Sequence, residues 1–429
     1  MSGSEIAEKN NGFTKYQITV IAILAILQFT IVLDFMVLSP LGERLLEELH
    51  ITTSQFGLVV SAYAFSAGAS GLLAAGFADK WDRKKLLLFF YTGFILGTIL
   101  CAIAPTYHFL LLARIITGIF GGVISSVSFA IISDLFRMDQ RGRVMGFVQS
   151  AFAASQIFGL PIGLLLSNHF GWHAPFWMIA SFGVMLGIVI LIYLKPVTAH
   201  LRFISDRNPF QHMFKTLSNS NYLKAFLATT CLATGGFMMM PFGTAFGVNN
   251  MGLTREQLPV LYGVTGIFSM VFGPLIGKLS DKIGKYTVFI TGSVISMMMV
   301  AIYTRLGITP LWMVISINVV LFVGIASRMI SASALMTAIP EPEDRGAFMS
   351  INSSVQQFSG GIASAIAGLI VVQRNDGKID HYDTLGMVVI LSMVIAIGLV
   401  YIINSYVQQK IKMSAVNTEK ANEIIVEGI

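Results

Sequence analysis

Long apolar runs separated by short polar segments make up most of this chain. A bilayer-spanning helix needs about 20 mostly apolar residues, and twelve runs approach or exceed that length: 18–39, 56–78, 86–104, 107–133, 144–168, 172–194, 222–247, 257–279, 287–305, 310–337, 346–371 and 384–406. Barrel strands are shorter and alternate between apolar and polar residues. Because only helices and closed barrels satisfy their backbone groups in lipid, the pattern predicts an all-α membrane protein with twelve transmembrane helices.

The composition supports a membrane location. The chain has 429 residues, of which 55% are hydrophobic and 12% charged, whereas soluble domains carry about 25% charged residues. The net charge of +6 does not indicate a nucleic-acid partner, because the positive residues lie in short loops where membrane topology explains them. The two cysteines, Cys101 and Cys231, lie in apolar runs and indicate neither a disulfide framework nor a metal site.

The charged loops predict the orientation in the membrane. If the N-terminus is cytoplasmic, the segments on that side hold 20 Lys and Arg residues, and those on the opposite side hold 5. Positive residues gather on the cytoplasmic side of membrane proteins. We therefore expect an integral, multi-pass protein of a bacterial inner membrane, with both termini in the cytoplasm.

The chain repeats itself after about 201–204 residues. The segment 51–56 reads ITTSQF and the segment 253–258 reads LTREQL. A charged loop at 75–85 has a counterpart at 277–285. Duplicated halves are typical of transporters, whose substrates bind where the halves face each other.

The repeat predicts how the chain divides. The connection between the sixth and seventh apolar runs is the longest internal one and contains Pro196 and Pro209. We expect an N-terminal six-helix bundle at 1–195, a cytoplasmic linker at 196–221, and a C-terminal six-helix bundle with a cytoplasmic tail at 222–429.

Motifs in both halves carry a family resemblance. They are Asp79-Lys80 with Arg83-Lys84 in the first charged loop, Gly277 to Lys285 in the second, Arg114-Ile-Ile-Thr-Gly118 in the fourth span, and Gly159-Leu-Pro-Ile-Gly163 in the fifth. With these motifs the sequence resembles the major facilitator superfamily over nearly its whole length. It is most similar to the twelve-helix drug/proton antiporter and sugar-efflux branch. The resemblance implies two pseudo-symmetric bundles that rock around a central substrate site.

The resemblance also implies a gating role for five loop charges: Asp79, Arg83, Asp134, Asp281 and Lys285. Asp79 would contact the loop Arg and the start of the eleventh span, and so hold the two halves together. Asp134 would take over Arg83 when this contact changes, which makes a two-state element. The alternative is that these charges only set the topology.

Asp34 is the most informative single residue. It lies about 9 Å from one end of the first span, and Arg114 lies about 11 Å from the same side in the fourth. A carboxylate buried in a membrane is costly and usually functional. Burial favours the protonated carboxyl, whereas a nearby Arg favours the carboxylate, so we expect Asp34 to bind protons and cationic substrate. The alternative is a static ion pair. The second half has Gly235 at the matching position.

Other polar or adaptable side chains on the spans are candidates for the substrate cavity. Arg328 in the tenth span has no acid at a similar depth in the second half, so it either binds an anionic group of the substrate or reaches backbone carbonyls or the interface. The remaining candidates are Gln28, Gln149, Gln156, Met238, Asn318, Asn352 and Gln356. For each polar residue among them, the alternative to a role in the cavity is a contact between two helices.

The fifth span carries a possible conformational weak point. Gly159 and Gly163 are small residues four apart, which permits tight helix contact, and Pro161 lies between them. The resemblance implies that this motif serves antiport by restricting leak through the cavity.

The leading functional hypothesis is proton-coupled efflux of a small organic compound such as a drug or sugar, as in multidrug transport. The proton gradient would supply the energy, without a cofactor, and the partners would be substrate, protons and the lipid bilayer around a monomer. No enzyme is expected, because the nearest P-loop pattern, 273–278, is one residue short. The alternatives are a facilitator or proton symporter that takes up a metabolite, anionic if Arg114 and Arg328 bind it, and a non-transporting membrane sensor.

Overall fold

The computed structural model describes residues 13–77, 80–198, 201, 216–341 and 344–427. Over this part of the chain, eleven helices are long and apolar enough to cross a membrane. The remaining predicted span corresponds to α16 (Arg345–Ile370), which has 26 residues. Its seven Ser, Asn and Gln residues between 350 and 359 reduce its hydropathy. The all-α membrane fold is confirmed, and the count of twelve spans stays a prediction.

The first half of the chain forms one group of helices. Their bounds are α1 (Lys15–Val37), α2 (Gly42–Glu48), α3 (Thr53–Phe77), α4 (Arg83–Ala102), α5 (Tyr107–Leu135), α6 (Met138–Gln149), α7 (Ala151–Ala154), the π-helical turn η2 (Ser155–Gly159), α8 (Leu160–Phe170) and α9 (Ala174–Tyr193). The predicted fifth span is therefore built from several segments, and the π-helical turn ends two residues before Pro161.

The second half forms a similar group. It contains α11 (Ser220–Phe237), the 3-10 turn η4 (Met240–Phe242), α12 (Gly243–Asn249), α13 (Leu258–Ile283), α14 (Lys285–Tyr303), α15 (Leu311–Met336), α16, a two-stranded antiparallel ribbon of β1 (Val372–Gln373) and β2 (Ile379–Asp380), and α17 (Tyr382–Glu427). The boundaries of the two bundles and of the linker stay predictions, since most of the linker lies outside the described residues.

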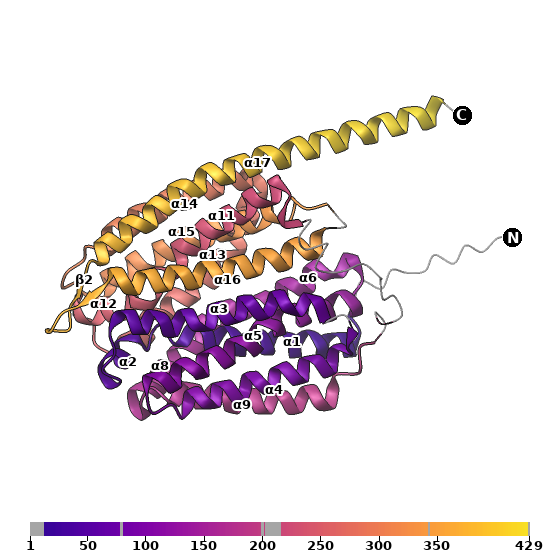
Figure 1. The fold of residues 1–429 in the computed structure, drawn as a ribbon. Helices are drawn as coiled ribbons and strands as arrows, with labels where there is room; N and C mark the ends of the chain where they lie inside the picture. The colour runs from indigo at the N-terminus through magenta and orange to yellow at the C-terminus, as the bar shows by residue number, and fades with distance from the viewer. Residues whose placement is uncertain (1–12, 78–79, 199–200, 202–215, 342–343, 428–429) are drawn as a thin grey trace.

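The last helix differs from the prediction. The twelfth apolar run ends near 406, yet α17 continues to Glu427 over 46 residues and extends beyond the rest of the bundle in Figure 1. Neither Gly nor Pro interrupts the segment 399–427, so nothing in the local sequence stops the helix. The predicted cytoplasmic tail is therefore largely a continuation of the last span.

Polar residues mark several helix starts. Thr14 and Gln17 form a reciprocal capping box at α1, and the Asp82 carboxylate accepts from the Lys84 amide at the start of α4. The Thr106 hydroxyl accepts from the Phe109 amide at the start of α5. Such side chains satisfy backbone amides that have no partner inside the helix.

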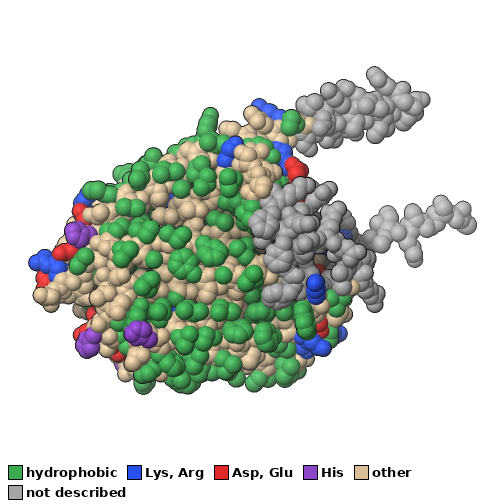
Figure 2. Space-filling model, viewed as in Figure 1, with side chains coloured by type: hydrophobic (Ala, Val, Ile, Leu, Met, Phe, Trp, Pro, Cys, Tyr) green, Lys and Arg blue, Asp and Glu red, His purple; other side chains and the backbone are tan. Residues whose placement is uncertain are grey.

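The helices run between two ends of one elongated bundle. Figure 1 shows the start of α1 and the last turns of α17 at the same end, which we call the terminal end, and α2, α12 and β2 at the opposite end, which we call the far end. Figure 2 shows hydrophobic side chains over the face between the two ends, while charged and His side chains gather at the ends. Among the exposed apolar residues are Leu96 (56%), Ile188 (53%) and Leu391 (60%). A protein surface of this kind suits a lipid environment.

Helix α3 packs closely on both of its sides. Within its own half, a Cβ on Gly122 of α5 would lie 2.2 Å from the Ala67 carbonyl oxygen of α3. Toward the other half, a Cβ on Gly368 of α16 would lie 2.7 Å from the Thr53 carbonyl oxygen, and α3 and α16 lie side by side in Figure 1. Small residues let helix backbones approach this closely in lipid. Helix α3 thus joins the two halves.

Polar contacts close the far end between the halves. Arg255, in the loop before α13, donates to Glu43 of α2 over 3.0 and 2.8 Å and also pairs with Glu47. The hydrogen bonds with Glu43 raise the pKa of the Arg255 guanidinium further above its usual range. The Thr53 hydroxyl donates to the Val371 carbonyl over 2.6 Å, and the Ser39 hydroxyl donates to the Met240 carbonyl.

The contact between α3 and α5 yields a first prediction. Replacing Gly122 by Leu forces the two backbones apart, so we expect the free energy of unfolding to fall by about 1–3 kcal/mol. The measurement is the apparent melting temperature of the purified protein in detergent. Gly398→Leu is the matched control, because a Cβ on Gly398 of α17 would meet no atom of a neighbouring helix within 4 Å. Equal melting temperatures of the two variants would contradict the packing described.

The far-end contacts yield a second prediction. Arg255→Ala removes the ion pairs with Glu43 and Glu47, and since the Arg255 side chain is 35% exposed, water screens them. We expect the closed far end to lose about 1 kcal/mol of stability relative to the open one, which is a roughly fivefold change in the ratio of closed to open molecules. Pulsed electron paramagnetic resonance between spin labels on Phe170→Cys and Ile308→Cys, with both native cysteines replaced, measures the separation of the halves.

The matched control for this measurement is Arg305→Ala. Arg305 lies just after α14 and donates to the Ala301 carbonyl of that helix, within its own half, so its removal leaves the far end closed. A distance distribution that Arg255→Ala leaves unchanged would show that these pairs do not hold the far end together.

Candidate functional site

The deepest charged contact in the first half joins Asp34 and Arg114. Asp34 lies one turn before the end of α1, and Arg114 lies about two turns after the start of α5. The Arg114 Nη1 atom donates to the Asp34 Oδ2 atom over 2.7 Å, and the two side chains are 1% and 0% exposed. The structure therefore brings the two predicted residues into direct contact in the interior of the bundle.

Two further helices complete this site. The Thr98 hydroxyl of α4 donates to the Asp34 Oδ1 atom over 3.2 Å. The Arg114 guanidinium carbon lies 4.5 Å from the centre of the Tyr63 ring on α3, at cation–π distance. The Arg114 Nε atom is buried and has no acceptor among the described residues. Four helices thus meet around one carboxylate and one guanidinium. Sequence reasoning missed Thr98 and Tyr63, since neither residue stands out from its apolar run.

This arrangement links protonation to packing. A buried ion pair is costly to bring out of water, and the loss of one charge leaves the other uncompensated, at a cost of about 3–5 kcal/mol. If Asp34 takes up a proton, Arg114 remains charged beside a neutral carboxyl. Asp34 can therefore take up a proton only if the surrounding helices or a ligand compensate the charge of Arg114.

Arg328 is a buried charge of the second half on α15, the helix that corresponds to α5, although Arg114 itself aligns with 315–318. Its side chain, on α15, is 3% exposed, and its Nε and Nη2 atoms are buried without an acceptor in the part of the chain that the structure describes. Gly235 of α11, which aligns with Asp34 in the repeat, is its neighbour: a Cβ there would lie 3.5 Å from the Arg328 Nη1 atom.

Three predicted cavity residues make interhelical contacts or are buried. The Ser125 hydroxyl donates to the Gln28 Oε1 atom over 3.4 Å, and the Thr229 hydroxyl donates to the Asn352 Oδ1 atom over 2.6 Å. Gln156 is 7% exposed within the π-helical turn.

The other predicted cavity residues are scattered. Asn318 is buried on α15, and Met238 is 1% exposed within the apolar core, so Met238 does not line an open space. Gln356 is half-buried on α16, and Gln149 is exposed at the end of α6. Over the described residues, no hydrogen bond joins any two of the predicted cavity residues, in contrast to Asp34 and Arg114.

The glycines of the fifth span lie against the first helix. A Cβ on Gly159 would lie 2.5 Å from the Leu33 Cδ1 atom, and one on Gly163 would lie 3.2 Å from the Val37 Cγ2 atom. The ring of Pro161 faces the second half, where it lies 3.6 Å from a Cβ built on Gly263 of α13. This segment therefore touches both the helix of Asp34 and the opposite half.

Four of the five predicted gating charges lie at the terminal end, in the part of the chain that the structure describes. The Arg83 Nε atom lies 3.2 Å from the Asp134 Oδ2 atom, with both side chains largely buried. Lys285 pairs with Asp281 over 3.0 Å within the second half, at an exposed position. Asp79 lies outside the described residues.

At the far end, sequence reasoning missed Arg255 as a contact between the halves. Two signals were available. Arg255 occupies the repeat position of Thr53, and Glu43 and Glu47 lie four apart, on one face of a short helix.

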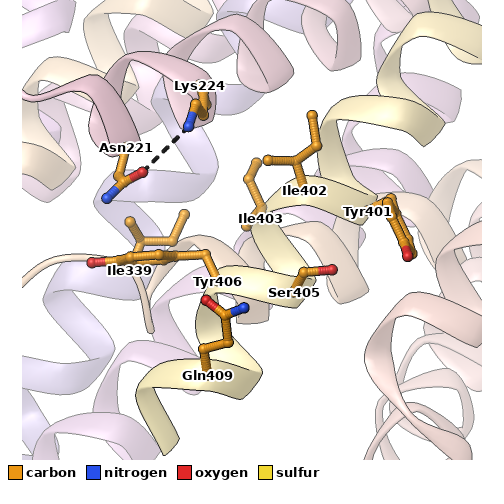
Figure 3. A pocket seen from close by; sticks show the side chains of 9 residues that line it. All are labelled: Asn221, Lys224, Ile339, Tyr401, Ile402, Ile403, Ser405, Tyr406 and Gln409. Carbon is orange, nitrogen blue, oxygen red and sulfur yellow. Dashed lines mark hydrogen bonds between the residues drawn. The ribbon is translucent and has the colours of Figure 1, made fainter. Parts of the chain in front are cut away.

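A separate pocket lies at the terminal end of α11 and α17. Its volume is about 350 Å³, and its lining residues are Asn221, Lys224, Ile339, Tyr401, Ile402, Ile403, Ser405, Tyr406 and Gln409. Figure 3 shows Lys224 bonded to Asn221 at its edge. None of the predicted site residues belongs to this lining.

Comparisons with known proteins agree with this architecture. The uncharacterized MFS-type transporter YceJ of Bacillus subtilis (strain 168) is 28% identical over 345 residues, which cover 80% of this chain and 86% of YceJ. Multidrug resistance protein 3 of the same organism is 30% identical over 146 residues, covering 34% of this chain and 28% of that protein.

Solved structures share the fold. The D-xylose-proton symporter superposes with a TM-score of 0.74 at 16% sequence identity, covering 89% of this chain and 97% of the symporter. The family model of the Major Facilitator Superfamily matches residues 24–365 and 249–415. The sequence motifs, the helical fold and these matches agree, and the chain belongs to the major facilitator superfamily of transporters.

Proposed function

We propose that this transporter exports a small organic compound, such as a drug or sugar, in exchange for protons by alternating access. The observation that carries the proposal is the buried contact between Asp34 and Arg114. It is a titratable group in an otherwise apolar interior, and intramembrane acids of this kind mark ion and substrate pathways.

The direction of transport rests on the relatives and on the fifth-span motif. The similarity to a multidrug resistance protein supports efflux, and the fold shared with a proton symporter supports proton coupling. Gly159 and Gly163 pack on the helix of Asp34, and Pro161 faces the second half, so this segment is placed to transmit a change at Asp34 to the interface between the halves.

The cycle that we propose uses both ends of the bundle. The far end is closed by Arg255 with Glu43 and Glu47. Proton binding at Asp34 would weaken its contact with Arg114 and favour the rearrangement that opens the far end. At the terminal end, Asp79 would hold the opposite conformation through the loop Arg, and Asp134, which pairs with Arg83 here, would take over Arg83 when that contact breaks. Asp281 with Lys285 would act in the second half.

The proposal also covers the oligomeric state, the membrane and the energy source. We propose a monomer in a bacterial inner membrane with both termini in the cytoplasm, driven by the proton gradient without a cofactor and without enzymatic activity. Uptake of an anionic metabolite is the second candidate, because Arg328 is buried without an acid partner among the described residues. A non-transporting sensor is a third reading, which the charged contacts at both ends do not favour.

The proposal predicts that Asp34→Asn abolishes substrate-triggered proton movement. Asn cannot bind and release a proton, while it retains the size of the side chain and its place beside Arg114. The measurement is the internal pH of proteoliposomes after addition of cationic drugs, neutral sugars or organic anions. We expect proton release with one of these classes for the wild type, and the signal of empty liposomes for Asp34→Asn.

Asp376→Asn, in the exposed loop between β1 and β2, is the matched control and should keep the wild-type signal. Substrate flux that moves no protons and is unaffected by Asp34→Asn would sink the antiport proposal and leave a facilitator.

A further inference from the structure

Arg328 is a buried positive charge without a charged partner. Its side chain is 3% exposed, and no ion pair of Arg328 is found over residues 13–77, 80–198, 216–341 and 344–427. The Nε and Nη2 atoms have no acceptor there either. The Phe289 ring centre lies 6.0 Å from its guanidinium carbon, at the limit of a cation–π contact. A guanidinium carries five N–H donors in a planar fork, and most of them are unused here.

The first half shows what is missing. There Arg114 receives its carboxylate from α1, at the position that aligns with Gly235 of α11. A Cβ on Gly235 would lie 3.5 Å from the Arg328 Nη1 atom and 3.7 Å from Nη2. The guanidinium therefore faces the place where the first half carries an acid, and the second half carries no side chain at all.

Open space lies beside Gly236, the residue that follows Gly235 on α11. Ala225, Thr229, Leu232 and Gly236 follow one another at helical spacing along one face of α11, and the first three are buried. Gly236 is nevertheless exposed, and no atom lies within 4 Å of a Cβ built on it. Gly235 itself is buried, so the open surface of α11 begins at the neighbouring Gly236, and a small ligand would approach Arg328 from that side.

Hydroxyl groups lie nearby. The Ser392 Oγ atom of α17 would be 3.6 Å from a Cβ on Gly235, and its hydroxyl donates to the Val389 carbonyl of the same helix, a bond that an anion would have to replace. The Ser296 hydroxyl of α14 is buried without a partner among the described residues and lies against Gly324, one turn before Arg328. Hydroxyl donors complement a guanidinium in binding an oxyanion or halide.

We propose that an anion binds to Arg328 between α11, α15 and α17, in the place of the carboxylate that Asp34 supplies to Arg114. The ligand is a carboxylate group of the transported compound or a free halide, since a guanidinium accepts either. The identification of the carboxylate as part of a substrate rests on the proposed transport function, whereas anion binding itself does not.

The other accounts of Arg328 fit less well. An Arg that reaches the membrane interface would lie close to a helix end, but Arg328 is about 12 Å from the end of α15 at Met336 and is buried. An Arg that bonds backbone carbonyls would have acceptors for Nε and Nη2, which are absent in the described part of the chain.

The experiment compares three variants at Gly235 in the purified full-length protein. Gly235→Asp supplies an internal carboxylate to Arg328, Gly235→Asn has the same shape without the charge, and Gly235→Ala adds a methyl group that makes only ordinary contacts. Melting temperatures are measured at constant ionic strength in sodium isethionate, whose anion is bulky, and after replacement of isethionate by chloride, acetate or benzoate.

We expect at least one of these three anions to raise the melting temperature of the wild type and of Gly235→Ala saturably, by about 2 °C or more. Gly235→Asp should melt higher than Gly235→Asn in isethionate and should not respond to the anions. A response to chloride identifies a free halide, and a response confined to acetate and benzoate identifies a carboxylate group.

The proposal is overturned if none of the three anions stabilises the wild type. It is also overturned if Gly235→Asp responds as strongly as Gly235→Ala, or melts no higher than Gly235→Asn. Asp34→Asn should keep the wild-type response, because it leaves the second half unchanged. Binding and proton movement are thus measured separately, and failure of one proposal is distinguishable from failure of the other.

Discussion

A charge buried in an apolar helix bundle must find a partner, and the centre of the first half is arranged around that requirement. Asp34 and Arg114 come from α1 and α5, with Thr98 of α4 and the Tyr63 ring of α3 beside them. The close approach of α5 to α3 makes this possible. A Cβ on Gly118, one turn after Arg114, would lie 2.5 Å from the Tyr63 carbonyl oxygen. The small residue that joins the two helices also places the guanidinium over the ring.

The two halves are related by an internal repeat, yet they use equivalent positions differently. Position 34 carries the acid of a buried pair, while its equivalent, Gly235, leaves Arg328 without one. Thr53 and Arg255 are also equivalent and both reach across the interface, the first through a neutral hydrogen bond and the second through ion pairs. The fold therefore keeps the geometry of the repeat while the chemistry of single positions has diverged.

Apolar periodicity was sufficient to predict the helices, because a run of about 20 apolar residues has few alternatives to a membrane helix. Comparing depths along the spans also predicted that Asp34 and Arg114 meet, since both lie at a similar distance from the same end of their spans. Contacts that depend on helix rotation were beyond that reasoning: Met238 points into the core, and Arg255 meets Glu43 across more than two hundred residues. The length of α17 was missed because apolarity ends before the helix does.

The two kinds of charged contact suit opposite tasks in alternating access. The Arg255 side chain is 35% exposed, so water replaces its partners at little cost when the far end opens, and such pairs are worth only about 0.2–1 kcal/mol each. The pair of Asp34 and Arg114 has no access to water in this conformation, and removal of one charge from such a buried pair costs about 3–5 kcal/mol. A thermal fluctuation is therefore enough to break the far-end contact, whereas the central contact needs a proton or a ligand. That difference would make the central pair the element that decides when the far end opens.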